Sequence, residues 1–225
     1  MPTSTRSTIP SCARSSVRPV TAIFLIDHET GRIVYTVAKK LEFGTNLLSG
    51  PYHNTRLSRA FRAARVAIDA DFVQLVDFES YAPSLGAPAA FVAAPIFHEG
   101  HRLGVVALQI PLAHIDAVMT GDQKWQERGL GQTGEAYLVG PDYWMRSDAR
   151  FFLETPEQYL ETIAATGVPT DVLQLMRAHR STVLFQQITT PDARAALNGQ
   201  TGTATNLGYR GQPVLQCANQ CWALL

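Results

Sequence analysis

The stretch AAFVAAPIFHEGHRLGVVALQI, residues 89–110, decides the fold of this 225-residue chain. Two apolar, β-rich runs, residues 89–97 and 102–110, are joined by the polar turn His98-Glu99-Gly100-His101. Strand-like runs separated by a short turn that contains glycine are typical of a β-hairpin. The sequence therefore predicts an antiparallel sheet, and it lacks the βαβα alternation of a parallel nucleotide-binding sheet.

The segments before and after this hairpin complete the same layer. Residues 21–39 have the pattern of a second hairpin, and residues 53–70 carry apolar side chains at helical spacing, with Asn54 or Thr55 as the cap. Residues 72–78 form another strand-like run, and a further helix begins at Pro111. The expected order of strand, strand, helix and three strands is an antiparallel sheet with a helix on one face.

The second half of the chain repeats this layout. Its expected elements are strands within 135–149, 181–189 and 201–217 and helices at about 156–166 and 170–180. Thr155 begins a capping box for the first of these helices. We divide the chain into a disordered segment (1–20), a first unit (21–118), a polar linker (119–134) and an incomplete second unit (135–225).

The composition is that of a globular protein without a charged target. Hydrophobic residues make up 46% of the chain, and 19 lysines and arginines balance 19 acidic residues. This balance disfavours nucleic acid or an anionic membrane as a partner. Cys12, Cys217 and Cys221 match neither a zinc site nor a disulfide framework. No apolar run reaches the roughly 20 residues of a membrane helix, and residues 1–20 lack the apolar core of a secretory signal.

Residues 129–134, Gly-Leu-Gly-Gln-Thr-Gly, match the dinucleotide-binding pattern G-x-G-x-x-G. That pattern needs a strand before the first glycine and a helix after the last, so that the phosphates meet a helix N-terminus. Here a polar, helix-like segment precedes the glycines and a strand-like segment follows them. We interpret the run as a flexible linker between the two units.

Two other motifs favour no specific chemistry. His98-Glu99-Gly100-His101 is one residue short of the zincin motif and lies in a turn, so we expect no metal site. Arg56, Arg59, Arg62 and Arg65 form a stripe on the first helix. We interpret this stripe as a solvated helix face or as the edge of an anionic small-molecule site.

Residues 77–96 mix aromatic rings, small residues, prolines and a few polar groups. This mixture is typical of a small-molecule pocket, although a proline-rich loop that covers the core would have the same composition. Asp77 and Glu79 lack a partner base, and we expect no catalytic residues. Gln109 is polar within an apolar strand, which fits either a partner inside the pocket or an edge position. The candidate ligand-binding residues, with three polar anchors and three aromatic walls, are Asp77, Ser84, Gln109, Phe78, Tyr81 and Phe91.

Several of these segments, in this order, resemble a double-Cache sensor domain. The matching stretches are FLIDHETGRIVYTVAK, FGTNLLSGPY, YAPSLGAPAAFVAAPIF, GVVALQIP, GLGQTGEAYLVGPDYWMRSDARF and TGTATNLGYRGQPVL. The resemblance covers residues 21–216 and implies an α+β fold of two tandem PAS-like units, each an antiparallel sheet flanked by helices. Domains of this family belong to bacterial chemoreceptors, sensor histidine kinases and nucleotide cyclases, and ligands usually bind in the membrane-distal half, here the first.

The chain departs from the family pattern in three places. Residues 1–20 supply neither a transmembrane helix nor the long helix that spans both halves, and the last residues, CANQCWALL, depart from the final strand. The R-x-W-Y signature with which some members hold amino acids is absent. We therefore expect a fragment, truncated or damaged at both ends, and an amino-acid ligand is not implied.

The sequence thus favours a non-catalytic, ligand-sensing module on the extracytoplasmic face of a bacterial membrane receptor. We expect a small-molecule ligand and no cofactor, and the resemblance leaves a homodimer of the full-length receptor open. One alternative is a fragment of a nucleotide cyclase or another signalling enzyme whose catalytic domain lies outside this chain. Others are a Rossmann-type dinucleotide-binding enzyme and a free-standing solute-binding protein.

Overall fold

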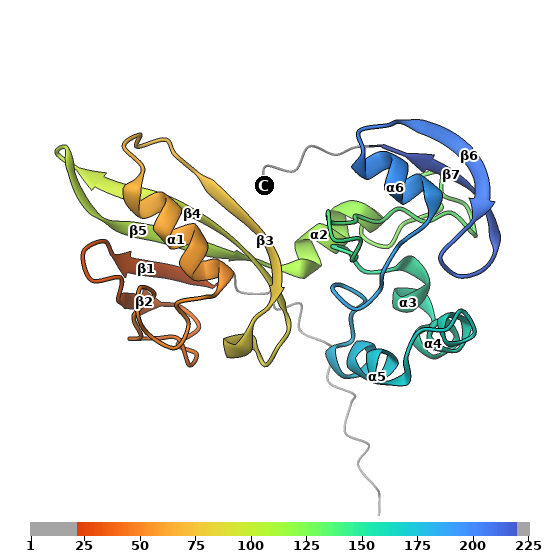
Figure 1. The fold of residues 1–225 in the computed structure, drawn as a ribbon, viewed down its shortest axis with the longest axis horizontal. Helices are drawn as coiled ribbons and strands as arrows, with labels where there is room; N and C mark the ends of the chain where they lie inside the picture. Colours follow the sequence, from red (N-terminus) through yellow and green to blue (C-terminus); the bar gives the residue numbers. More distant parts are fainter. Residues whose placement is uncertain (1–21, 220–225) are drawn as a thin grey trace, which may run out of the picture.

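The computed structural model describes residues 22–219, which form two halves joined by a helix and a run of turns (Figure 1). The first half consists of β1 (Ile23–Asp27), β2 (Ile33–Thr36), α1 (Arg56–Val66), β3 (Gln74–Ser80), the 3₁₀ turn η1 (Ala82–Ser84), β4 (Pro88–His98) and β5 (His101–Ile110). All neighbouring strands are antiparallel, in the order β2-β1-β5-β4-β3. The α+β class and the antiparallel sheet predicted from residues 89–110 are confirmed.

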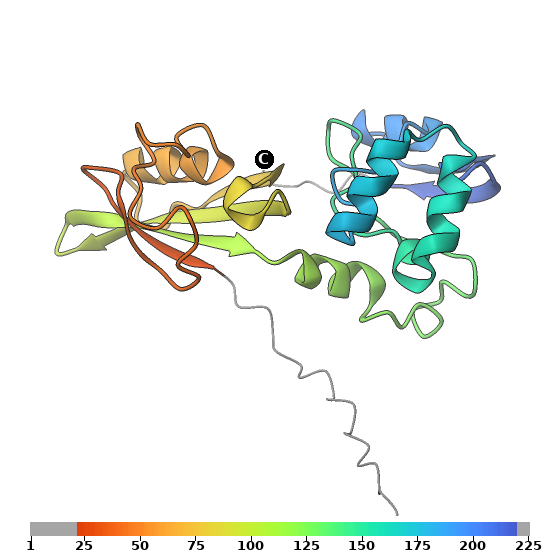
Figure 2. The same ribbon diagram turned by 90° about the horizontal axis from the view of Figure 1, so that it is seen from below.

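Helix α1 covers one face of this sheet (Figure 2). The predicted cap is Thr55, whose side chain accepts a hydrogen bond from the backbone N–H of Ser58. Leu57 and Phe61 on its apolar side are fully buried against inward-facing strand residues such as Phe24. This core holds the helix on the sheet, because each such side chain contributes about 2 kcal/mol when it leaves water.

A β-bulge interrupts the pairing of β3 with β4. Val76 lies opposite Phe91 and Glu79 lies opposite Ala89, so β3 has one extra residue in this interval. Bulges turn side chains away from the regular alternation of a strand. Asp77 lies within this bulge, at the edge of the sheet that faces the second half.

The second half is built mainly of helices. After α2 (Leu112–Thr120) and a run of turns, it contains α3 (Arg150–Glu154), α4 (Pro156–Ala164), α5 (Thr170–His179), α6 (Pro191–Leu197), β6 (Gly202–Leu207) and β7 (Pro213–Ala218). Its one named sheet among residues 22–219 is the β6–β7 pair. The helices predicted at about 156–166 and 170–180 are confirmed as α4 and α5.

The strands predicted within 135–149 and 181–189 are wrong. These segments form only isolated bridges, between Val139 and Met145 and between Trp144 and Gln187. A few backbone bonds join the two arms of 135–149, such as Arg146 N–H to the Leu138 carbonyl at 2.8 Å. The pairing stops there because the Leu138 N–H donates to the Ser147 hydroxyl.

The predicted capping box at Thr155 is also wrong. Its hydroxyl lies 3.3 Å from the carbonyl oxygen of Phe151 in the preceding α3, and no side-chain cap forms at α4. The two helices follow each other without a loop, so the hydroxyl is drawn to the end of the first helix rather than to the start of the second.

None of the helices within residues 22–219 is long and apolar enough to cross a membrane. The predictions for residues 1–20, Cys12 and Cys221 lie outside the described residues, and Cys217 is an exposed free thiol.

Candidate functional site

Three polar side chains on the inner face of the first half are fully buried without partners. They are Thr36 at the end of β2, Glu42 in the following loop and Tyr81 at the start of the η1 loop, each at 0% exposure. The Thr36 hydroxyl, both Glu42 carboxylate oxygens and the Tyr81 hydroxyl have no hydrogen-bond partner among the described residues. Leaving such an atom unsatisfied costs about 1–3 kcal/mol, so this arrangement calls for an explanation.

The Tyr81 hydroxyl is surrounded by negative charge. Burial, followed by the charges of Glu42 and Glu79, raises the pKa of the hydroxyl well above its usual range. Burial also raises the pKa of the Glu42 carboxyl. The ring of Tyr81 packs edge-on against Phe91, with their centroids 5.0 Å apart. The apolar contact fixes the ring, and the acceptors near its hydroxyl could receive hydrogen bonds from a ligand.

A polar contact joins the loop after β2 to the η1 loop beside this region. The Lys40 ammonium donates a hydrogen bond of 2.9 Å to the Ser84 hydroxyl, which joins the loop after β2 to η1. Ser84 is therefore a surface contact rather than a polar anchor inside a pocket. Lys40 is exposed, so the contact can open at little cost in free energy.

Asp77 belongs to the junction between the two halves. Its carboxylate receives two hydrogen bonds of 2.8 Å, from Nε and Nη2 of Arg146. The side chains of Arg146 and Asp77 are 7% and 13% exposed, and the more exposed Asp142 also accepts from the same guanidinium. A Cβ at Gly140 would overlap this guanidinium, so a larger residue there would displace Arg146 from its present position. Asp77 is thus already paired within the protein.

The remaining predicted residues are divided between two cores. Phe91 lies in the core of the first half, whereas Phe78 packs with Val183 and Leu184 of the second half. Gln109 lies opposite Phe91 on β5 and is partly buried. The structure therefore brings the rings of Tyr81 and Phe91 together. Gln109 is the cross-strand neighbour of Phe91, and the Ser84 backbone N–H donates to the Tyr81 carbonyl. Ligand binding by any of the six predicted residues stays a prediction.

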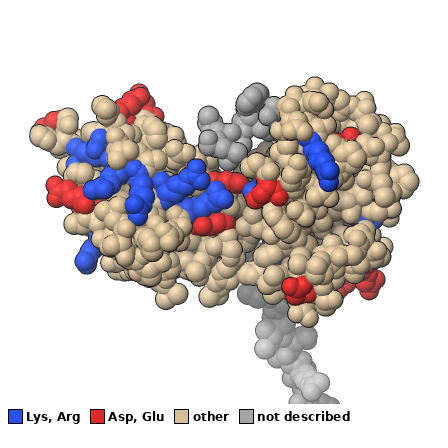
Figure 3. Space-filling model, viewed as in Figure 1, with Lys and Arg blue, Asp and Glu red and all other residues tan. Residues whose placement is uncertain are grey.

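The arginine stripe of α1 divides into two pairs. Arg62 donates to the carbonyl of Leu48 at 2.9 Å and Arg65 donates to that of His28, so both tie α1 to the loops beside it. Arg56 and Arg59 line a cleft of about 300 Å³ at the junction. Figure 3 shows the basic surface running along α1 to the acidic groups beside the second half.

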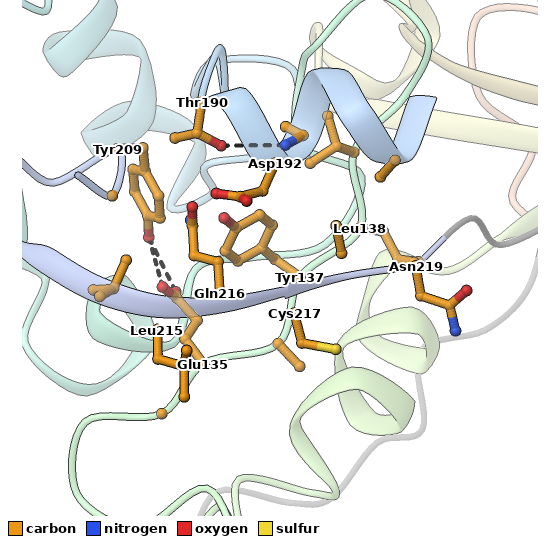
Figure 4. A pocket seen from close by; sticks show the side chains of 18 of the residues that line it. Glu135, Tyr137, Leu138, Thr190, Asp192, Tyr209, Leu215, Gln216, Cys217 and Asn219 are labelled. Atoms are coloured by element: carbon orange, nitrogen blue, oxygen red, sulfur yellow. Dashed lines mark hydrogen bonds between the residues drawn. The ribbon is translucent and has the colours of Figure 1, made fainter. Parts of the chain in front are cut away.

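A larger cavity lies in the second half and holds about 600 Å³. Its wall includes Glu135, Tyr137, Asp192, Tyr209 and Gln216 (Figure 4). None of these residues could be recognised as a candidate from the sequence, because they come from segments up to 81 residues apart and no local pattern indicates that these segments meet.

The backbone of the glycine run at 129–134 binds the side chain of Arg150. The carbonyl oxygens of Gly131 and Gly134 accept hydrogen bonds of 3.0 and 2.6 Å from Nη1 of Arg150, and this guanidinium lies 4.8 Å from the Trp125 ring. No helix follows Gly134 before α3. A phosphate would find no helix N-terminus there, which excludes the Rossmann alternative.

The turn at residues 98–101 is a tight hairpin turn. Glu99 and Gly100 have positive φ angles of 49° and 80°, as two-residue hairpin turns require. His98 and Glu99 are exposed. Within residues 22–219 no three His, Cys, Asp or Glu side chains converge as metal ligands would.

No protein-family model and no curated protein sequence matches the chain. Among solved structures, it is similar to the ligand-binding domain of the Pseudomonas fluorescens chemoreceptor CtaA in complex with L-serine, at 18% identity, over 56% of this chain and 46% of that one, with a TM-score of 0.38. The amino-acid chemoreceptor PctC of Pseudomonas aeruginosa PAO1, in complex with GABA, matches at 17% identity over 56% and 48%, with a TM-score of 0.37.

The extracellular domain of the histidine kinase vpHK1S-Z8 matches at 12% identity over 82% of this chain and 58% of that one, with a TM-score of 0.45. The chain thus spans about half the length of the chemoreceptor domains it matches. These proteins are of the classes that the double-Cache resemblance names. Likenesses at these TM-scores assign neither a ligand nor a site to this chain.

Proposed function

We propose that this chain is the small-molecule-sensing module of a bacterial transmembrane receptor and that its first half binds the ligand beside Glu42 and Tyr81. The observation that carries the proposal is that these side chains are fully buried and their polar atoms lack partners among the described residues. Natural proteins keep such costly groups chiefly where function uses them. The module itself is non-catalytic in this proposal.

The ligand would supply what these atoms lack. A carboxylate accepts hydrogen bonds only and a tyrosine hydroxyl can donate one or accept, so a ligand rich in donor groups fits. The loops joined by Lys40 and Ser84 would open to admit it and close afterwards. A ligand that binds the closed form better shifts the population toward that form by its differential affinity.

The junction provides a route for this shift to the second half. The η1 loop follows β3, whose bulge holds Asp77 against Arg146, and Phe78 packs on Val183. A displacement of the η1 loop would pull on both contacts. An extracytoplasmic position, an output domain beyond this chain and dimerisation of the whole receptor complete the proposal; the amino acids bound by CtaA and PctC are one ligand class to include in a screen.

A thermal-shift screen of small metabolites on the wild-type chain tests the proposal. A true ligand raises Tm by mass action, because it binds the folded state alone. The same compounds are then applied to Tyr81→Phe and Glu42→Gln, which remove one polar function each and keep the shape. Tyr35→Phe serves as the matched control, since Tyr35 is exposed on β2.

The proposal expects the shift to disappear in Tyr81→Phe and Glu42→Gln and to persist in Tyr35→Phe. Equal shifts in all four proteins would contradict it. Asp77 is unsuitable as a probe, because its substitution would break the pair with Arg146 whatever the ligand does.

A further inference from the structure

The second half contains a cavity that the first-half site does not use. It holds about 600 Å³ and lies between β7, α6 and the extended segment after the linker (Figure 4). Its apolar wall includes Leu138, Val139 and Leu215. A volume in this range, with apolar walls and a few convergent polar groups, is typical of a site for a small organic molecule.

Carboxylates form part of the polar wall. The Glu135 carboxylate accepts hydrogen bonds of 2.9 and 3.1 Å from the Tyr209 hydroxyl and one of 2.8 Å from the backbone N–H of Arg150. The Asp192 carboxylate accepts hydrogen bonds of 2.8 and 2.9 Å from the side-chain amide of Asn206. Both groups are held in place and keep lone pairs for a further donor.

An unpartnered acceptor lies between them. Figure 4 shows the side chains of Gln216 and Tyr137 pointing toward Asp192. The Gln216 Oε1 atom is buried and has no hydrogen-bond partner among the described residues. The amide of Gln216 also lies within hydrogen-bond reach of Tyr137, and its Oε1 atom stays available to a donor on a ligand.

The charge balance of the wall is negative. Arg210 is the only basic residue of the lining, and its guanidinium lies 3.5 Å from the centroid of the Phe151 ring, which engages it. Burial raises the pKa of the Glu135 carboxyl although Arg210 and Arg150 are near. Burial and the charges of Glu135 and Asp192 raise the pKa of Tyr137 to about 12. A positive charge inside the cavity would stabilise the ionised form of both carboxylates.

We propose that this cavity is a second ligand site that binds an organic cation. Its ammonium group lies among Glu135, Asp192 and Gln216, and its apolar body lies against Leu138 and Val214, which is on the same face of β7 as Gln216. The faces of Tyr137 and Tyr209 add cation–π attraction, which suits alkylated ammonium groups. This site is independent of the Glu42–Tyr81 region, so the two can be tested separately.

Two pairs of isosteric probes test the proposal by titration calorimetry on the wild-type chain. Choline is compared with neutral 3,3-dimethylbutanol, and 1,4-diaminobutane with neutral 1,4-butanediol. We expect at least one cation to bind about tenfold or more tightly than its neutral partner, as the loss of a charged hydrogen bond implies. Equal affinity within both pairs, or no binding by any probe, would overturn the proposal.

Variants then locate the site. Asp192→Asn and Glu135→Gln should each weaken binding of the cation about tenfold, whereas Glu157→Gln, which removes the same charge from an exposed position on α4, should not. Circular dichroism and Tm confirm that each variant is folded; if Glu135→Gln fails to fold, Asp192→Asn alone decides. Binding that is unchanged in Asp192→Asn contradicts the assignment, and binding that persists in Tyr81→Phe separates this site from the first-half site.

Discussion

The two halves have similar sequence patterns, but they build their hydrophobic cores from different elements. The first half packs a five-stranded sheet under α1 around a core of fully buried side chains. In the part of the second half that the structure describes, the named sheet is the β6–β7 pair, and short helices surround it beside a cavity of about 600 Å³. In our proposals the first half therefore holds a ligand within a closed core, and the second half holds one in an existing cavity.

Truncation of a core side chain should show this difference most strongly. Phe91→Ala removes a fully buried ring that touches both Phe24 and Tyr81. We expect it to lower the free energy of unfolding by about 4 kcal/mol in urea titrations. Leu215→Ala, at a surface side chain of β7 that is 78% exposed, is the control and should cost less than about 0.5 kcal/mol. Similar losses in the two variants would show that the Phe91 ring does not carry the core of the first half.

Removal of Arg146 tests how the halves are joined. Arg146→Met leaves Asp77 buried without its partner, and we expect a loss of about 3 kcal/mol. The double variant Arg146→Met/Asp77→Leu should recover most of this stability, because the uncompensated carboxylate is gone. Arg177→Met, which breaks the exposed pair with Glu157, is the control and should change little. A double variant as unstable as the single one would show that the ion pair is not the cause.

The pH dependence of stability has a source at the same junction. The Asp116 carboxylate on α2 accepts from the backbone N–H of Asp148 at 2.7 Å. Burial and the charge of Asp148 raise the pKa of Asp116 to about 7. A raised pKa means that the folded protein holds the proton more tightly than the unfolded chain, so its stabilising effect is present at low pH and is lost as the pH rises through about 7.

Urea titrations between pH 5 and 8 measure this effect. The free energy of unfolding of the wild-type chain should fall across this range, and that of Asp116→Asn should fall less steeply. Glu42, Glu79 and Glu135 also have raised pKa values and contribute a fall of the same sign, which remains in the variant. Identical slopes in the two proteins would show that Asp116 is not the source.

Helices and strands with a regular spacing of apolar residues could be predicted from the sequence. The β4–β5 hairpin, α1 with its Thr55 cap, α4 and α5 follow from apolar spacing and turn residues that act locally. The segment 135–149 could not be predicted, although its apolar alternation matches residues 22–36. Its backbone pairs only in part, through bonds such as Arg146 N–H to the Leu138 carbonyl, and the Leu138 N–H is bonded to the Ser147 hydroxyl instead of to backbone. Where such pairing stops depends on tertiary contacts.

The candidate site was only partly predictable for a related reason. The composition of residues 77–96 identified Tyr81 and Phe91, which do meet. Glu42 lies in a loop without any pattern, and its burial depends on the fold of the whole first half. The prediction of Asp77 as a ligand anchor could not take into account its partner in the protein, because Arg146 is 69 residues away along the chain.

The smallest expected change tests the central claim most directly: the free energy of unfolding of Tyr81→Phe without ligand. If the hydroxyl is kept for a ligand, its removal relieves an unsatisfied buried atom and stabilises the free protein by about 1 kcal/mol. The same variant should lose the ligand-induced rise in Tm, while Tyr35→Phe changes neither quantity. A Tyr81→Phe chain that is less stable than the wild type and still responds to the ligand would contradict the account.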